Sequence, residues 1–338
     1  MEIIRQRGYA RAGLVGNPSD GYHGKTISLL LQDFYAEAIL YEWEDLELIL
    51  SQEDQSRFRS IHELARDVKT HGYYGGIRLV KATIKKFVDY CRDNGHTLHG
   101  RNFSIRYESN IPRQVGLAGS SAIIVATLRA LLEFYGIEIP LPVQPSLALR
   151  VETDELGIVG GLQDRVIQVF GGLVYMDFAR EVMRTACGYQ CGVYEQLNPA
   201  LLPPLYVAYC VEEGEPTEVL HNPLRARYNQ GDPEVVAAMQ KFASLAAQAR
   251  TALLQRDHER LSRLMDENFD TRRKICQLHP AHVEMVEVAR STGASAKFAG
   301  SGGATLGVYR DEAMYAELKN RLERIGCRVF KPTIVQPG

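Results

Sequence analysis

The sequence lacks several features that would point to particular classes of protein. Its 39 Lys and Arg residues nearly balance its 41 Asp and Glu residues, which leaves a formal net charge of -2 over 338 residues. Such a chain has no general attraction for nucleic acid or for an anionic membrane. No apolar run approaches the roughly 20 residues that a membrane-spanning helix needs, and residues 1–11 hold no apolar signal core. We therefore expect a cytoplasmic protein that binds neither nucleic acid nor membranes.

Cysteine is also scarce. The six cysteines are spread over a chain that is long enough to bury its own core, so no disulfide framework is expected. Cys187 and Cys191 are close in sequence, but no second Cys or His pair follows at zinc-finger spacing, which argues against structural zinc. A Walker A loop and a dinucleotide-binding fingerprint are both missing. Any nucleotide site must therefore use a different kind of loop.

The spacing of apolar residues predicts an α+β protein of two domains. In the first half we expect strands at residues 10–15, 26–31, 36–40, 46–50, 103–107 and 173–178, and helices at about 79–91, 121–135, 145–156 and 158–170. In the second half we expect strands at 205–211, 304–309 and 327–331, and helices at about 233–255, 257–277, 281–292 and 312–325. The proline-rich stretch 199–204 separates the two halves, so we place the domains at 1–200 and 201–338.

Residues 112–122 form the most informative segment, because glycines and two serines lie between a predicted strand and a strongly apolar helix. Gly116 and Gly119 let the backbone approach a ligand closely. The first amides of the following helix have no partners within the helix and carry the positive end of its dipole, so they can bind an anion. Such a loop can hold a triphosphate. The alternative is that Ser120 or Ser121 only caps the helix.

Two further segments favour the phosphate loop. Residues 11–20 place an Arg and an Asp around a tight turn, and residues 297–304 supply a second glycine loop. The three segments, in this order and spacing, resemble the three motifs of the GHMP small-molecule kinases. That resemblance implies an N-terminal domain like domain 2 of ribosomal protein S5, which binds ATP, and a ferredoxin-like α/β C-terminal domain. It also implies that the seven residues of the loop contact the nucleotide: Gly116, Leu117, Ala118, Gly119, Ser120, Ser121 and Ala122.

The phosphate loop is one residue longer than the usual family form. In this it is similar to the loop of the branch that phosphorylates fucose and heptose at the anomeric hydroxyl. Segments 14–20, 72–76, 110–114 and 155–165 resemble the plant-type glucuronokinase branch, and this likeness runs over nearly the whole chain. It implies a 1-kinase that uses ATP and Mg²⁺ to phosphorylate D-glucuronate. The alternatives are a 1-kinase for a heptose, fucose or galacturonate, and a GHMP-fold sugar sensor without catalysis. The sequence leaves the oligomeric state open.

The resemblance assigns the chemical roles. Asp164 corresponds to the catalytic base of the family's sugar kinases, although an Asp beside Arg165 is otherwise typical of a surface ion pair. Arg11 corresponds to the arginine that assists the reacting hydroxyl or the transferring phosphoryl group. Glu152, twelve residues before Asp164, is the predicted Mg²⁺ ligand together with the hydroxyl of Ser121, or of Ser120. Glu155 is the rival carboxylate on the same predicted helix.

The resemblance also indicates where the sugar binds. Asp20 corresponds to the aspartate that binds sugar hydroxyls, and Asn17 stands where galactokinase has a carboxylate, a change compatible with an acidic sugar. A cation must then hold the sugar carboxylate, and Arg113, Arg165 and Lys297 are the candidates. The second glycine loop is expected to close over the sugar or the phosphates with Gly300, Ser301 and Gly302.

Overall fold

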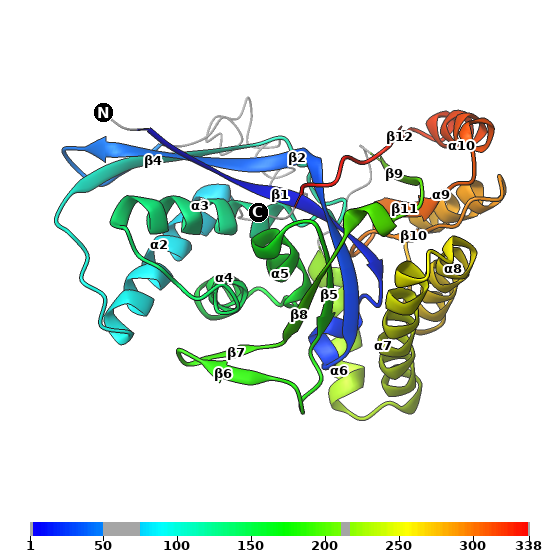
Figure 1. Ribbon diagram of the computed structural model, residues 1–338, viewed down its shortest axis with the longest axis horizontal. Coiled ribbons are helices and arrows are strands. Elements are labelled where there is room, and N and C mark those ends of the chain that lie inside the picture. The colour runs from blue at the N-terminus through cyan, green and yellow to red at the C-terminus, as the bar shows by residue number, and fades with distance from the viewer. Residues whose placement is uncertain (1–2, 50–74, 211–216, 337–338) are drawn as a thin grey trace, which may run out of the picture.

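The computed structural model describes residues 3–49, 75–210 and 217–336 (Figure 1). The likeness at residues 72–74 therefore lies outside the described residues. Two sheets with helices on their faces dominate the described chain, as expected for an α+β protein. None of the described helices is long and apolar enough to cross a membrane.

The first sheet is built around one long strand, β2 (Lys25–Trp43). Strand β1 (Ile3–Val15) pairs with β2 over its whole length. Along the other edge of β2, β4 (Asn102–Ser109) pairs with residues 36–43 and β5 (Leu173–Asp177) pairs with residues 25–29. Strands β3 (Glu47–Leu48) and β8 (Val193–Leu197) complete the order β3-β4-β2-β5-β8, with β1 on the free edge of β2.

The prediction of separate strands at 26–31 and 36–40 was wrong, because both belong to β2. Gln32 and Asp33 interrupt the apolar pattern between the two predicted strands. The structure instead has an irregular register here: Tyr9 pairs with Tyr35, while the next residue, Ala10, pairs with Leu31. The extra residues of β2 are accommodated as a bulge, which preserves the pairing on both sides of it.

Four helices lie against one face of the first sheet (Figure 1). They are α2 (Gly76–Asp93), α3 (Gly119–Tyr135), α4 (Gln144–Arg150) and α5 (Gln163–Phe170). The predicted helix at 121–135 is α3, which is almost wholly buried and ends at Gly136 in the left-handed conformation, with φ of 62°. Its burial explains why its apolar residues cover nearly every side of the helix.

The segment between α4 and α5 differs from the prediction. The helix expected at 145–156 changes at Val151 into a short π-helix, η3 (Val151–Glu155), and the helix expected to begin at 158 begins only at Gln163. Gly160 and Gly161 keep residues 158–162 out of a helix, and a side chain at Gly161 would collide with the carboxylate of Asp20. Gly161 therefore allows the segment before α5 to approach Asp20 closely, and this segment is not helical.

The second sheet has the order β10-β11-β9-β12. Its strands are β9 (Leu205–Cys210), β10 (Lys297–Phe298), β11 (Ala304–Val308) and β12 (Cys327–Phe330). It is accompanied by α7 (Pro233–Leu254), α8 (His258–Ile275), α9 (Pro280–Arg290) and α10 (Glu312–Arg324). The elements that the sequence did not predict are β8, β10, α6 (Thr217–Asn229), the hairpin of β6 (Arg184–Ala186) and β7 (Tyr189–Cys191), and the short turns η1 (Ser19–Tyr22) and η4 (Pro199–Leu201).

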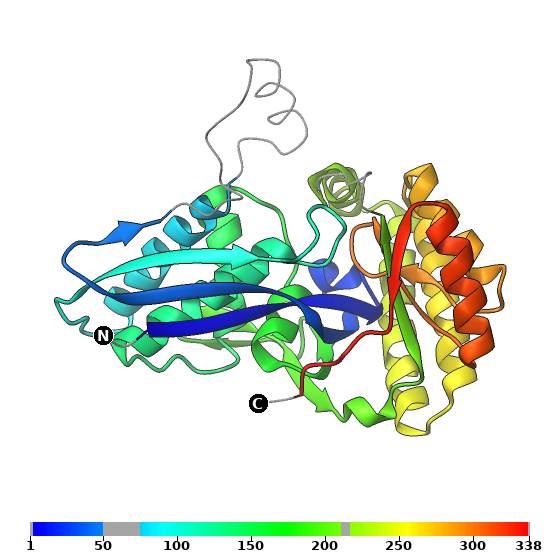
Figure 2. The same cartoon turned by 90° about the horizontal axis from the view of Figure 1, so that it is seen from above.

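The two halves share one hydrophobic core. Leu14 of β1, Leu245 of α7 and Leu306 of β11 belong to the same cluster of buried side chains. The end of the chain also returns to the first sheet, where Ile334 forms a bridge with Leu31 of β2 (Figure 2). Because η4 lies between the last strand of the first sheet and the first strand of the second, the division at residue 200 remains our proposed domain boundary.

The contact between β1 and α3 predicts a sharp effect of one methyl group. A Cβ on Gly8 would overlap the carbonyl oxygen of Ala122 at the start of α3, and backbone cannot move aside as a flexible side chain can. We expect Gly8→Ala to destabilise the protein by about 3 kcal/mol, which corresponds to a fall in Tm of about 4 °C. Gly100→Ala is the matched control, because nothing lies within 4 Å of the added Cβ there. Equal melting temperatures for the two variants would contradict this packing.

Candidate active site

A cavity of about 540 Å³ opens where segments from both halves of the chain meet. Its walls come from the end of β1 and η1, from the loop before α3, from η3 and the loop before α5, and from α6, α8 and the second glycine loop. The three motifs identified in the sequence therefore face one space. Cavities of this size and mixed polarity are typical of small-molecule sites.

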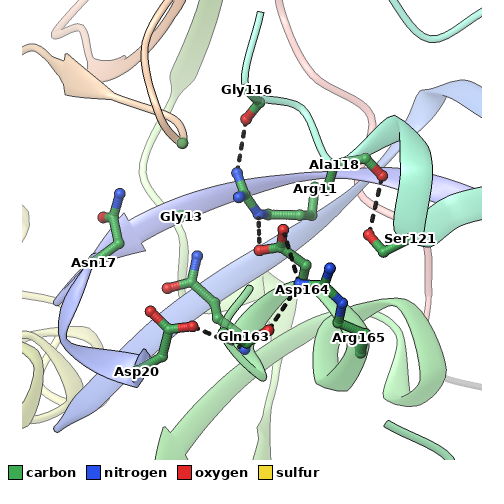
Figure 3. A network of polar contacts seen from close by, with 12 residues as sticks. Arg11, Gly13, Asn17, Asp20, Gly116, Ala118, Ser121, Gln163, Asp164 and Arg165 are labelled. Atoms are coloured by element: carbon green, nitrogen blue, oxygen red, sulfur yellow. Dashed lines mark hydrogen bonds and ion pairs between the residues drawn. The ribbon is translucent and has the colours of Figure 1, made fainter. Parts of the chain in front are cut away.

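Arg11 and Asp164 both line this cavity and contact each other (Figure 3). The Arg11 side chain is only 8% exposed, and its Nε donates to Oδ1 of Asp164 over 2.6 Å. Its Nη1 donates to the carbonyl oxygens of Gly116 and Ala299, each 2.8 Å away. One guanidinium group thus joins β1 to the phosphate loop, to α5 and to the second glycine loop. Asp164 keeps one-fifth of its side chain exposed, so a substrate hydroxyl can reach it.

The phosphate loop contains residues in the left-handed region of the backbone. Gly116 has φ of 72°, and Ala118, at the N-cap of α3, also has a positive φ, 63°. No side chain caps α3, so the structure does not support the reading of Ser120 or Ser121 as a simple cap. The uncapped start of a 17-residue helix beside the cavity can bind an anion through its free amides.

The two serines of the loop have different surroundings. Ser121 is fully buried, and its hydroxyl donates to the carbonyl oxygen of Ala118 over 3.2 Å. Ser120 lines the cavity, and its hydroxyl donates to Oε1 of Glu152 over 2.8 Å. The structure therefore brings Ser120, and not Ser121, to Glu152. Ala122 lies below the cavity surface, whereas Leu117, Ala118 and Gly119 line it.

Glu152 and Ser120 supply oxygen ligands of the type that Mg²⁺ prefers. Glu152 is 1% exposed and also forms an ion pair with Arg165, which in turn donates to the carbonyl oxygen of Gly161 over 2.7 Å. In the described part of the chain, no cluster of three or more His, Cys, Asp or Glu side chains could hold a metal alone. The residues fit an ion whose remaining ligands come from a nucleotide and water.

Asp20, which its motif predicts to bind sugar hydroxyls, lines the cavity. Its Oδ2 accepts a hydrogen bond from the backbone amide of Gln163 over 3.2 Å, which connects η1 to the start of α5 (Figure 3). Burial, and then the negative charge of Asp164, raises the pKa of Asp20 to about 6. The raised pKa means that ionising Asp20 destabilises the folded protein. A carboxylate with such a raised pKa is typical of a binding site rather than of a stabilising contact.

Lys297 does not lie where a substrate-binding cation was expected. It is 1% exposed, and its Nζ donates to the carbonyl oxygens of Gly13 and Phe298 and to Oδ1 of Asn17, all within 2.7 Å. It is absent from the cavity wall. Burial, followed by the charges of Arg272 and Arg11, lowers the pKa of Lys297 well below its usual value. Lys297 therefore supports Asn17 and the first turn from behind.

The second glycine loop meets the phosphate loop directly. Gly300 and Ser301 line the cavity, whereas Gly302 lies behind them against His282. A side chain at Gly300 would collide with the carbonyl oxygen of Gly116, which explains why glycine is needed there. Contact between these loops closes one side of the cavity.

Sequence reasoning missed the residues that α8 contributes. Arg272 is 2% exposed and donates to the carbonyl oxygens of Gly300 and Ser301, over 2.6 and 2.9 Å. Asn268 accepts from the amide of Gly16 over 2.6 Å and donates to the carbonyl oxygen of Asn17 over 3.0 Å. Both are polar residues on the buried face of an amphipathic helix, four residues apart, and this is the signal that could have identified them.

Comparison with known proteins agrees with this arrangement. Residues 78–172 match the GHMP kinases N terminal domain. Glucuronokinase 1 of Arabidopsis thaliana is 46% identical over 310 residues, which cover 90% of this chain and 84% of that protein. The Lin0012 protein of Listeria innocua has a similar fold, with a TM-score of 0.78 at 16% identity over 100% of this chain and 99% of the other. The phosphomevalonate kinase of Streptococcus pneumoniae has a TM-score of 0.75 at 16% identity, covering 99% and 100% of the two chains.

The solved structures support the fold alone, because their identities are low. The relative at 46% identity covers most of both chains, and its name agrees with the family of the matched N-terminal domain. A phosphate loop with free helix amides, an Arg–Asp pair at its mouth and a second glycine loop closing over it are the parts that a phosphoryl-transfer enzyme requires. The chain belongs to the GHMP kinase family, and it is an ATP-dependent phosphotransferase.

Proposed function

We propose that this enzyme transfers the γ-phosphate of MgATP to the anomeric hydroxyl of D-glucuronate, giving 1-phospho-glucuronate and ADP. The observation that carries the substrate assignment is the 46% identity to a glucuronokinase over nine-tenths of the chain. At this identity the cavity of the relative is expected to have the same general construction. The charge of the cavity supports an acidic substrate independently.

The residues that line the cavity carry an excess of positive charge. Six arginines contribute to the wall, Arg11, Arg78, Arg113, Arg165, Arg225 and Arg272, against three carboxylates, Asp20, Glu152 and Asp164. The cavity wall therefore has three more positive than negative charges, although the whole chain has a net charge of -2. A local positive charge of this kind suits a site that binds two anions at once. ATP accounts for one of these anions and a sugar acid for the other.

Asp164 is the group we assign to the substrate proton. Its carboxylate is fixed by Arg11 and has partial access to the cavity, so it can accept a hydrogen bond from the attacking hydroxyl and take its proton as the phosphoryl group transfers. Arg11 also lies against the phosphate loop through Gly116. It therefore stands between the nucleophile and the phosphates, where its charge stabilises the transferring group.

Mg²⁺, when bound with ATP, neutralises charge on the β- and γ-phosphates. Ser120 and Glu152 are the residues we assign to it. Because Glu152 already pairs with Arg165, it would share its charge between Arg165 and a bound metal. The structure therefore favours a metal that the enzyme holds mainly through the nucleotide, with Glu152 and Ser120 fixing its position.

The position of Asn17 fits an acidic sugar. Its side chain accepts from buried Lys297, so it contributes no negative charge at the sugar end of the cavity. An Asp or Glu here would place a carboxylate beside Asp20 and close to a negatively charged substrate. We therefore interpret Asn17 as a residue that keeps this end of the cavity compatible with a sugar acid.

Release of ADP with a panel of sugars tests the proposal. We expect D-glucuronate to exceed D-glucose in kcat/KM by about two to four powers of ten, because a cation built to meet a carboxylate is left unpaired by a neutral sugar. The methyl glycoside of glucuronate should give no product, because its anomeric oxygen is blocked. Galacturonate, fucose and a heptose complete the panel. Equal efficiency with glucose, or phosphorylation of the methyl glycoside, would exclude a uronate 1-kinase, and absence of turnover with every sugar would favour a sensor.

Asp164→Asn tests the role of the carboxylate. The substitution preserves the volume of the side chain and removes the proton acceptor, so we expect kcat to fall by a factor of about 10² to 10⁴, with little change in the dissociation constant of ATP. Asp270→Asn is the control, because Asp270 is a half-exposed partner of Arg290 away from the cavity. Retention of activity within tenfold of the parent would remove Asp164 from the role of base.

Asp20→Asn should stabilise the folded protein while impairing catalysis. Because the pKa of Asp20 is raised to about 6 in the folded state, its ionisation costs stability. That cost is absent below about pH 4, close to the pKa of Asp in the unfolded chain, and it is fully present above about pH 6. We expect the Tm of the variant to exceed that of the parent by several degrees at pH 7.5, and the difference to shrink as the pH falls from 7 to 4. A Tm difference that does not change with pH would contradict the raised pKa of Asp20.

A further inference from the structure

The carboxylate of a sugar acid needs a cation that the protein does not already use. Three of the lining arginines are committed to protein acceptors. Arg11 bonds to Asp164 and two carbonyl oxygens, Arg165 to Glu152 and one carbonyl oxygen, and Arg272 to two carbonyl oxygens of the second glycine loop. Lys297 is buried outside the cavity. These groups already donate hydrogen bonds that hold loops in place, so they are poor candidates for binding the substrate carboxylate.

Arg225 of α6 has different surroundings. It lines the cavity, and its guanidinium carbon lies 4.8 Å from the centre of the Tyr22 ring. A Cβ placed on Gly21 would be 3.0 Å from its Nη2, so the guanidinium lies beside the residue that follows Asp20. Among the side chains that the structure describes, in residues 3–49, 75–210 and 223–336, no carboxylate forms an ion pair with Arg225. Its guanidinium group therefore faces the cavity without a compensating anion from these residues.

The position of Arg225 is fixed by its neighbours on α6. Leu224 is 2% exposed and packs in a cluster with Tyr22 and residues of α7. The ring of Tyr228 contacts that of Tyr22 edge to face, with centroids 4.7 Å apart. Arg227 donates to Asp232 over 2.7 Å and to the carbonyl oxygen of Ile275 over 2.8 Å. Stacking on Tyr22 holds the guanidinium plane in place before a ligand arrives, which lowers the entropy lost on binding.

Arg78 and Arg113 also line the cavity, but they belong to its phosphate side. Arg113 is part of the phosphate loop itself. Gly76, two residues before Arg78, packs against Tyr107 of β4, the strand that leads into that loop. Arg225 is therefore the arginine placed on the side of Asp20.

We propose that Arg225 binds the carboxylate of the sugar acid and thereby sets the preference of the enzyme for an acid over a neutral sugar. A guanidinium group can meet both oxygens of a carboxylate with two parallel hydrogen bonds. Asp20, next to Gly21 on the same turn, then accepts hydrogen bonds from the sugar hydroxyls. This inference rests on the proposed function, because it names the residue that reads the substrate's charge.

The test compares an acid with the corresponding neutral sugar in the full-length enzyme. For Arg225→Gln we expect kcat/KM with D-glucuronate to fall by a factor of about 100, mainly through KM. The slow turnover of D-glucose and the KM for ATP should stay within about threefold of the parent. Arg225→Lys keeps the charge without the planar fork and should recover part of the loss. Arg106→Gln, which replaces an exposed arginine on β4, should leave all of these values unchanged.

The ratio of kcat/KM with glucuronate to kcat/KM with glucose distinguishes the possible outcomes. An equal loss with glucuronate and glucose, or no loss with glucuronate, would overturn the role of Arg225 while leaving the proposed function standing. Thermal melts and the KM for ATP identify a variant that is merely misfolded, and the Arg225→Lys variant then carries the comparison. If the parent enzyme prefers another sugar acid, that acid replaces glucuronate in the ratio. If the parent prefers a neutral sugar to its acid, the proposed function and the role of Arg225 are both wrong.

Discussion

The site depends on one buried guanidinium group. Arg11 reaches Asp164 and two carbonyl oxygens, and these acceptors lie 153, 105 and 288 residues away along the chain. Two of its three acceptors are backbone carbonyls from glycine-rich loops, which have no regular structure of their own to fix them. A charge-assisted hydrogen bond from a buried arginine is strong enough to hold such loops in register. Asp164, the proposed base, and the loop before α3 are therefore oriented by the same side chain.

The sequence contained enough information for most of the regular structure. Helix α3 and its glycine end could be predicted because an apolar segment closed by Gly136 leaves few alternatives. The continuity of β2 could not, because Gln32 and Asp33 look like turn residues unless the partner strand is known. The late start of α5 depends on the approach of Asp20 to Gly161, a contact across 141 residues of chain that no local pattern records.

The site itself could be predicted only in part. The motifs identified the segments that line the cavity, but they did not indicate the direction of each side chain. Ser120 and Ser121 are adjacent, and which of them faces Glu152 is set by how α3 begins at Ala118 with a positive φ. Lys297 looks like a substrate ligand in sequence, yet three nearby acceptors draw its ammonium group behind the first turn. The contribution of α6 depends on tertiary packing, whereas α8 carried a signal in the polar residues Asn268 and Arg272 on its buried face.

The return of the chain end to the first sheet constrains how the cavity can open. Thr333 and Val335 exchange backbone hydrogen bonds with Gln32 and Leu30 of β2, so the second half of the chain is attached to the first at its beginning and again at its end. Attachment at these two places resists the swing that a single linker would permit. We therefore expect the two sheets to move together as one frame around the cavity.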